Sequence, residues 1–150
     1  MPFDIGEFID HPGQRLPIHL VLEGSWSDGG IRTVDRMTLD GEGFVQLGVL
    51  YVEGTVGGRV TEPCRRCLKP VTQSIERFEV FEVRTPLGEK ELDLSDDLLR
   101  LVLSAHDPNV LCRKDCRGLC PICGADLNED QNHTCHPPEE ERRTLRDLLR

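Results

Sequence analysis

The chain has 150 residues, of which 37% are hydrophobic and 30% are charged, and its net charge is −9 at pH 7. This composition suffices for a globular core, and no apolar run approaches the roughly 18 residues of a transmembrane helix. The acidic balance argues against a protein that binds nucleic acid over its whole surface. The N-terminus lacks the basic and apolar regions of a secretory signal, so we expect a cytoplasmic protein without a membrane partner.

The first half of the chain is typical of a small antiparallel β-sheet. Residues 16–23 alternate β-branched and polar side chains, which favours a strand. The pattern of residues 31–39 is ambiguous. Residues 43–61 are rich in β-formers and interrupted by glycines, as expected for curved strands or bulges. After the sequence C-R-R-C at 64–67, residues 71–83 resume strand-like alternation, so the cysteine pair is predicted to lie at a hairpin turn.

The clearest helix is predicted over residues 95–105, SDDLLRLVLSA. Ser95 is a suitable N-cap, two aspartates follow it at the positive end of the helix dipole, and the leucines form an apolar stripe. We expect this helix to cover the sheet. A second helix is predicted over residues 139–150, where acids come first and arginines later.

Seven cysteines and His133 fall into short-range pairs that favour metal binding. Cys120-Pro121-Ile122-Cys123-Gly124 has the C-P-x-C-G form of a zinc knuckle, in which Gly124 supplies a positive φ. Disulfides explain the pattern poorly, because seven is an odd number and no secretory segment is present. A thioredoxin-like redox pair at residues 64–67 would need a following helix, whereas a strand is predicted there.

We therefore predict two structural zinc ions. Because four protein ligands leave no open position for water, and no catalytic motif occurs, we expect neither an enzyme nor a small-molecule substrate. A single ion at the closely spaced cysteines 112, 116, 120 and 123 is an alternative, as is His136 in place of His133. The predicted ligand sets are Cys64, Cys67, Cys112 and Cys116 for one ion and Cys120, Cys123, His133 and Cys135 for the other.

Two segments that carry cysteine pairs, residues 64–90 and 112–124, each have a net charge of +2 and are the only net-basic parts of the chain. The first zinc would join them into one patch that could contact RNA phosphates. Equally, the charge could do no more than offset that of the thiolates. The candidate RNA-binding residues are Arg65, Arg66, Lys69, Arg113, Lys114 and Arg117.

Three stretches occur together: C-R-R-C-L at 64–68, L-D-L at 92–94, and D-C-R-G-L-C-P-I-C-G-A-D-L-N at 115–128. Together with Cys135 this pattern resembles the YceD family, a bacterial and chloroplast group, over about residues 15–150. The resemblance implies a role in the accumulation of large-subunit (23S) ribosomal RNA, with that RNA or a large-subunit ribosomal protein as partner. Where the family commonly has C-x-C at the end of the motif, this chain has His133-Thr134-Cys135, which retains a zinc ligand.

The predicted fold is α+β, with a small antiparallel β-sheet, a covering helix and a C-terminal zinc-ribbon-like module. Residues 1–110 would form the β-rich domain and residues 111–150 the zinc-binding module with its C-terminal helix. The favoured function is a non-enzymatic ribosome-biogenesis factor that supports the synthesis, processing or stability of large-subunit RNA. Two alternatives are a thiol- or zinc-based redox regulator and a protein-interaction adaptor without RNA contact.

Overall fold

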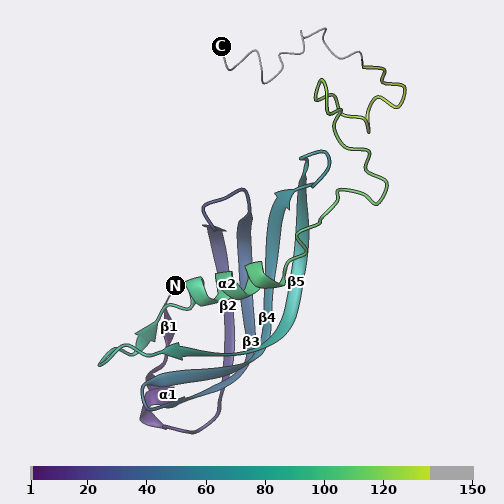
Figure 1. The fold of residues 1–150 in the computed structure, drawn as a ribbon. Coiled ribbons are helices and arrows are strands. Elements are labelled where there is room, and N and C mark those ends of the chain that lie inside the picture. The colour runs from purple at the N-terminus through teal and green to yellow at the C-terminus, as the bar shows by residue number, and fades with distance from the viewer. Residues whose placement is uncertain (1, 136–150) are drawn as a thin grey trace, which may run out of the picture.

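The computed structural model describes residues 2–135, and its main element is a four-stranded antiparallel sheet (Figure 1). The sheet follows the order of the chain, so that each strand pairs with the next one. A two-stranded sheet and two helices complete the secondary structure. The elements are β1 (Phe3–Asp4), α1 (Gly6–Asp10), β2 (Leu16–Ser27), β3 (Thr33–Gln46), β4 (Val49–Pro63), β5 (Pro70–Arg84), β6 (Glu91–Leu92) and α2 (Ser95–Ala105).

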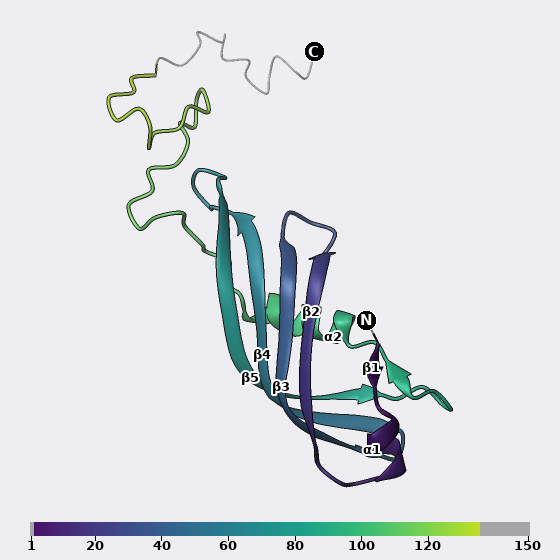
Figure 2. The same cartoon turned by 180° about the vertical axis from the view of Figure 1, so that it is seen from behind.

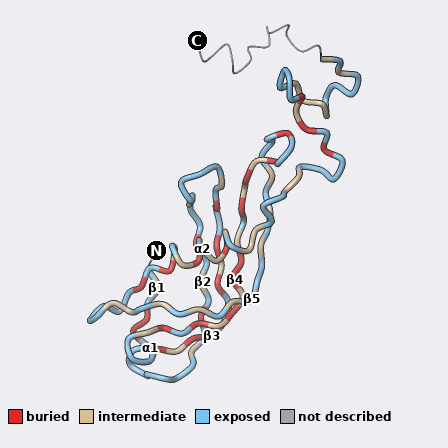
Figure 3. The backbone as a smooth tube through the Cα atoms, viewed as in Figure 1, coloured by how far each residue is buried: buried red, intermediate tan, exposed pale blue. Residues whose placement is uncertain are grey.

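Helix α2 covers one face of the large sheet, as Figures 1 and 2 show from opposite sides. Leu98 and Val102 lie on its buried side and form one hydrophobic cluster with buried residues of the strands. Figure 3 shows the buried residues in red. Gly58 of β4 lets the helix come close, because a Cβ atom at this position would lie 2.5 Å from Cγ1 of Val102. The inner face of the sheet and the helix thus form one apolar core, while the opposite face of the sheet carries no covering element within residues 2–135.

The secondary structure predicted from the sequence is confirmed in large part. The predicted helix over residues 95–105 is α2, and the predicted strand over residues 16–23 is β2, which continues to Ser27. The prediction of Ser95 as N-cap is wrong, because the helix begins at Ser95 and Leu94 occupies the cap position. The N–H group of Ser95 donates instead to Oδ1 of Asp93, at 2.9 Å.

Two features of the sheet were not resolved by the sequence pattern. The ambiguous stretch 31–39 belongs mostly to β3, which pairs with both β2 and β4. The apolar run 43–61 contains a hairpin turn rather than continuous strand, because Leu47 and Gly48 adopt φ values of 51° and 76°. The turn divides the run between the end of β3 and most of β4.

The fold class needs a correction, since the structure is β-rich rather than α+β. Helix α1 has five residues and α2 has eleven, whereas β3, β4 and β5 have 14 or 15 residues each. From residue 106 to residue 135 the backbone forms turns and one isolated bridge, Leu119 with Asp126. The predicted helix over 139–150 lies outside the described residues. No helix among residues 2–135 combines the length and apolar character needed to cross a bilayer.

The close approach of α2 to β4 can be tested by a double-mutant cycle at Gly58 and Val102. Gly58→Ala should lower the free energy of unfolding by about 1–3 kcal/mol, because the new methyl group overlaps Val102. Val102→Ala alone should lower it by about 2 kcal/mol through lost burial. In the double variant most of the overlap disappears, since of the Val102 contacts only that with Cβ, at 3.2 Å, remains. The loss should therefore fall short of the sum by about 1 kcal/mol in urea unfolding. Strictly additive losses would contradict this packing.

Candidate metal centres

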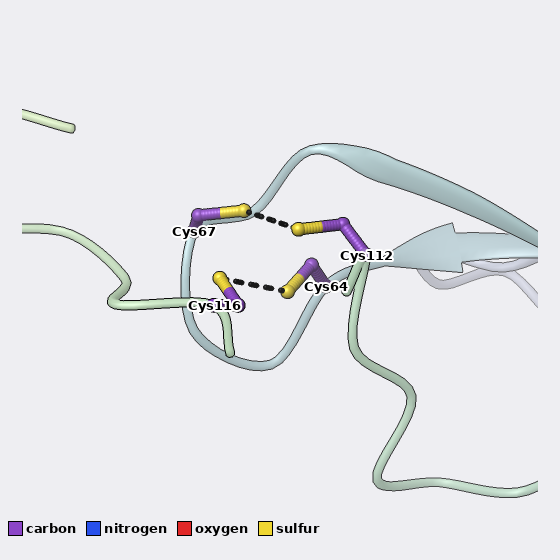
Figure 4. Close-up of side chains that lie close together, drawn as sticks. All are labelled: Cys64, Cys67, Cys112 and Cys116. Atoms are coloured by element: carbon purple, nitrogen blue, oxygen red, sulfur yellow. Dashed lines mark hydrogen bonds between the residues drawn. The ribbon is translucent and has the colours of Figure 1, made fainter. Parts of the chain in front are cut away.

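The first predicted ligand set comes together at one end of the sheet. Cys64 and Cys67 lie in the turn between β4 and β5, while Cys112 and Cys116 follow α2 in the chain, and Figure 4 shows the two pairs facing each other. The four sulfur atoms lie within 4.8 Å of one another. The group thus takes two cysteines from each side of the predicted domain boundary at residue 110. That boundary stays a prediction.

The sulfur–sulfur distances fit the tetrahedral coordination of a zinc ion. Two sulfurs that each bind zinc at about 2.3 Å lie about 3.8 Å apart. The Sγ atoms of Cys64 and Cys116 are 3.8 Å apart, and those of Cys67 and Cys112 are 3.4 Å apart. Three of the four cysteines are buried and Cys112 is exposed. The group therefore has the composition, spacing and enclosure of a four-thiolate zinc site.

Backbone N–H groups prepare Cys64 for ionisation. Burial of this side chain opposes the thiolate, yet N–H groups of Arg66, Cys112 and Cys67 outweigh it and lower the pKa of Cys64 to about 6. The neighbouring sulfur of Cys67 and burial act the other way on Cys112 and raise its pKa to about 12. A divalent cation supplies the charge that four adjacent thiolates need, and its binding would release the remaining protons.

The second predicted ligand set is also assembled. The ligand atoms of Cys120, Cys123, His133 and Cys135 lie within 4.8 Å of one another. Nε2 of His133 lies 3.3 Å from Sγ of Cys123. The other ring nitrogen, Nδ1, lies 3.7 Å from Oδ2 of Asp130. A carboxylate behind a metal-binding imidazole fixes the ring orientation and increases its basicity, so this arrangement favours Nε2 of His133 as a ligand.

The second set shows the same uneven ionisation as the first. N–H groups of Cys123 and Ile122 lower the pKa of Cys120 to about 6. Burial, followed by the sulfurs of Cys123 and Cys120, raises the pKa of Cys135 to about 11. The structure does not assemble the alternative single set of residues 112, 116, 120 and 123, and the alternative ligand His136 lies outside the described residues.

Both cysteine knuckles use one backbone turn. In each, the N–H group of the fifth residue donates to the carbonyl of the first: Leu68 to Cys64 at 3.0 Å and Gly124 to Cys120 at 2.9 Å. The fifth residue has a positive φ in both, 62° at Leu68 and 77° at Gly124. The positive φ predicted for Gly124 is thus confirmed. Leucine rarely adopts this conformation, which favours glycine.

The second centre is anchored to the first knuckle. The N–H group of Leu119 donates to the carbonyl of Arg66, at 3.1 Å. Lys69 bridges Asp126 and Glu129, with both Nζ–O distances at 2.9 Å. Lys69 and the N–H group of Asn128 lower the pKa of Asp126 to about 2. These contacts fix the segment that carries Cys120 and Cys123 against the β4–β5 turn.

Asn128 contacts the first centre, although neither predicted ligand set includes it. Its Nδ2 lies 3.5 Å from Sγ of Cys116, and its Oδ1 accepts hydrogen bonds from Nη2 of Arg113 and from the N–H group of Arg117, at 2.9 and 2.8 Å. It therefore connects a ligand of the first centre to two basic residues. The L-N that ends the motif at residues 115–128 was the available signal, although nothing in that pattern assigns Asn128 a contact.

The six candidate RNA-binding residues divide into two groups. Four have partners within the protein. Arg65 and Lys114 have no side-chain hydrogen bond or ion pair among residues 2–135. The four with partners are Arg66 with the carbonyl of Cys116, Lys69 with Asp126 and Glu129, Arg113 with Asn128 and Asp115, and Arg117 with the carbonyl of Gln131.

Comparison with known proteins shows that the chain is similar to mycobacterial proteins. The uncharacterized proteins Rv2926c of Mycobacterium tuberculosis and Mb2951c of Mycobacterium bovis are each 32% identical to it over 158 aligned positions, which cover 89% of this chain and 73% of each relative. The chain belongs to their family. No protein-family model matches it, and no solved structure matches it.

A shorter similarity connects the chain to a protein with a descriptive name. The large ribosomal RNA subunit accumulation protein YCED homolog 1, chloroplastic, of Zea mays is 35% identical over 52 residues. The matched part covers 35% of this chain and 18% of the maize protein. The similarity is therefore local.

Metal content tests the two centres directly. We expect two zinc ions per chain, each contributing on the order of 10 kcal/mol to folding. Cys123→Ser should remove one ion and leave the sheet folded, because its centre lies beyond the sheet. Cys116→Ser should remove the other ion and also lower the melting temperature of the sheet, since that centre holds the β4–β5 turn. Elemental analysis and circular dichroism measure both effects, and one ion per wild-type chain would contradict the assignment.

The contact of Asn128 with Cys116 gives a second test. Asn128→Ala should weaken zinc binding at the first centre about 10- to 100-fold, as expected when a group that orients a ligand is lost. Asn132→Ala is the matched control, because the side chain of Asn132 makes no hydrogen bond among the described residues. Competition with a chromophoric chelator measures both variants. Equal zinc affinity in the two would show that Asn128 does not support the centre.

Proposed function

We propose that this protein is a non-enzymatic ribosome-biogenesis factor of the YceD type that supports the synthesis, processing or stability of large-subunit ribosomal RNA. The observation that carries the proposal is the 52-residue similarity to the maize protein, whose name describes such a role. The proposed place of action is the cytoplasm. The proposed partner is the RNA itself or a large-subunit ribosomal protein.

The composition of the metal centres supports a binding role over a catalytic one. Each group already offers four protein ligands, so a zinc ion would have no open position for water or substrate. In such a site the ion stabilises the fold and positions the surrounding residues. The first centre would hold the β4–β5 turn, and the second centre would hold the segment that follows it.

The charge of the protein limits how RNA could bind. With a net charge of −9, the surface as a whole repels phosphates, so direct contact has to be local. Arg65 and Lys114 are exposed, their side chains have no partner among the described residues, and both lie next to ligands of the first centre in the sequence. Arg66 binds the carbonyl of Cys116, a ligand of the first centre, and Arg113 and Arg117 bind Asn128 and the carbonyl of Gln131. We therefore assign the first phosphate contacts to Arg65 and Lys114.

Binding to fragments of large-subunit RNA across a salt series tests this function. Each phosphate contact contributes about −0.7 to the slope of log affinity against log salt on single-stranded RNA. Arg65→Glu with Lys114→Glu should weaken binding and make the slope less negative by about 1.4. The zinc content should stay at the wild-type value, because neither residue is a ligand.

Arg36→Glu with Arg84→Glu is the matched control for charge. Both arginines are exposed on the sheet, away from the metal centres, and neither side chain has a partner among residues 2–135. This variant should bind RNA with an unchanged salt slope. Equal weakening in both double variants would indicate nonspecific attraction. Absence of RNA binding by the wild-type protein would leave a ribosomal protein as the partner, which is the adaptor alternative.

One observation favours a second candidate function, a thiol-based regulator. Cys112 is exposed, and its sulfur lies 3.4 Å from that of Cys67, so an oxidant could reach a pair that is close enough to join. Rapid loss of one zinc on mild peroxide treatment, reversed by reductant, is the result that would favour this function. The biogenesis function requires that zinc be retained.

A further inference from the structure

An open cavity of about 600 Å³ lies beside the first metal centre. Its walls come from the end of β4, the first knuckle, the turn before β3 and the turn after α2. It combines apolar, cationic and acidic side chains, and it is separate from both groups of metal ligands except that Cys64 forms part of its wall. The residues that define its chemistry are Ile31, Arg32, Glu62, Arg65, Leu68 and His106.

Glu62 is a buried acid with an unused acceptor. It is 8% exposed, and its Oε1 accepts a hydrogen bond from Nε2 of Gln73 at 2.7 Å. Its Oε2 has no hydrogen-bond donor among the described residues, since the nearest basic atom, Nε2 of His106, is 3.9 Å away. No buried side-chain oxygen of the described residues lacks a hydrogen-bond partner, so Oε2 is in contact with the solvent of the cavity. It therefore offers an acceptor to a ligand that brings a donor into the cavity.

His106 does not supply that donor, because its neighbours fix its tautomer. Its Nδ1 faces the carbonyl of Leu103, which can only accept a hydrogen bond, so Nδ1 carries the proton. Its Nε2 then accepts from Nη1 of Arg32, at 3.0 Å. Arg32 is in turn held by Asp28, at 2.9 Å. Both the imidazole of His106 and the guanidinium of Arg32 are thus engaged with other partners, and Oε2 of Glu62 remains open.

Leu68 gives the cavity an apolar wall, although its backbone has a positive φ that is unfavourable for leucine. It occupies the position at which the second knuckle has Gly124, with nearly the same φ, yet it carries a side chain that is 64% exposed. A non-glycine residue in this region costs on the order of 1 kcal/mol. The same turn is made by glycine elsewhere in this chain, so the knuckle itself does not require leucine. Ile31, 75% exposed, is a second apolar residue of the same cavity.

We propose that this cavity binds one unpaired RNA nucleotide whose base carries an exocyclic amino group. The inference rests on the proposed function, which supplies RNA as the ligand. Oε2 of Glu62 would accept a hydrogen bond from the amino group, as carboxylates do from N4 of cytosine. Leu68 and Ile31 cover the base, and Arg65, which has no partner among the described residues, binds the phosphate. Uracil presents a carbonyl oxygen in place of the amino group and would be repelled by the carboxylate.

Short homopolymers test this preference with the zinc-loaded full-length protein. Labelled tetracytidylate should bind about tenfold more tightly than tetrauridylate in fluorescence anisotropy at pH 7.5, because the two differ in the groups that face Glu62. Glu62→Gln should remove the preference, since an amide can present either a donor or an acceptor. Glu82→Gln, at an exposed position of β5, is the control and should keep it.

The variant Leu68→Gly distinguishes the effect of Leu68 on ligand binding from its effect on folding stability. Glycine suits a φ of 62°, so this variant should keep two zinc ions and a melting temperature at or above that of the wild type. It should nevertheless bind tetracytidylate several-fold more weakly, because the apolar wall is lost. A large fall in stability would mean that Leu68 is held in place for folding, and the wall would then have no assigned role in binding.

Three outcomes would overturn the cavity as a nucleotide site. These are equal affinity for the two tetramers, a preference that persists in Glu62→Gln, and no binding of either tetramer. None of them bears on direct contact with large-subunit RNA, which is decided separately by binding to fragments of that RNA. Failure of that broader assay together with no tetramer binding would remove both the nucleotide site and direct RNA contact, and would leave a ribosomal protein as the partner.

Discussion

The four sulfurs of the first centre hold together parts of the chain that are far apart in sequence. Cys64 and Cys116 are separated by 52 positions and Cys67 and Cys112 by 45. The sheet supplies one pair and the segment after α2 supplies the other, so this contact fixes how the C-terminal part sits on the sheet. The second centre, the partners of Asn128 and one wall of the cavity all depend on that connection.

The two centres share a backbone turn but differ in their surroundings. The first is enclosed, with three buried cysteines, whereas Cys123 of the second is exposed and its other members are only partly covered, apart from Cys120. Four of the six candidate basic residues near the centres bind carbonyl or side-chain oxygens of the C-terminal segment. These contacts account for the presence of basic segments beside the cysteines in a chain with a net charge of −9. Most of these basic side chains therefore make contacts within the protein.

Local patterns predicted much of this structure, and contacts between distant residues account for what they missed. Helix α2 and strand β2 follow from periodicity and terminal residues, and the two ligand sets follow from pair spacing in a chain with eight candidate ligands. The stretch that forms β3 was left ambiguous because it has no clean alternation, and its pairing with β2 and β4 decides its conformation. The burial of Glu62 could not be predicted at all, since it depends on Gln73 and on His106, which is 44 positions away in the printed sequence. Likewise, no spacing rule shows that Arg66 and Arg117 donate to carbonyls.

The long separation within the first centre has a consequence for the protein as it is made. Cys64 and Cys67 leave the ribosome before the two cysteines that complete their group, and at 5–20 residues per second the interval is about 2–10 s. The second centre lies within residues 120–135 and closes over a short stretch of new chain. During translation the first pair of thiols is therefore exposed to oxidants and to competing metals for longer than any other cysteines in the two centres. Correct loading depends on how quickly helix α2 docks and brings the second pair to them.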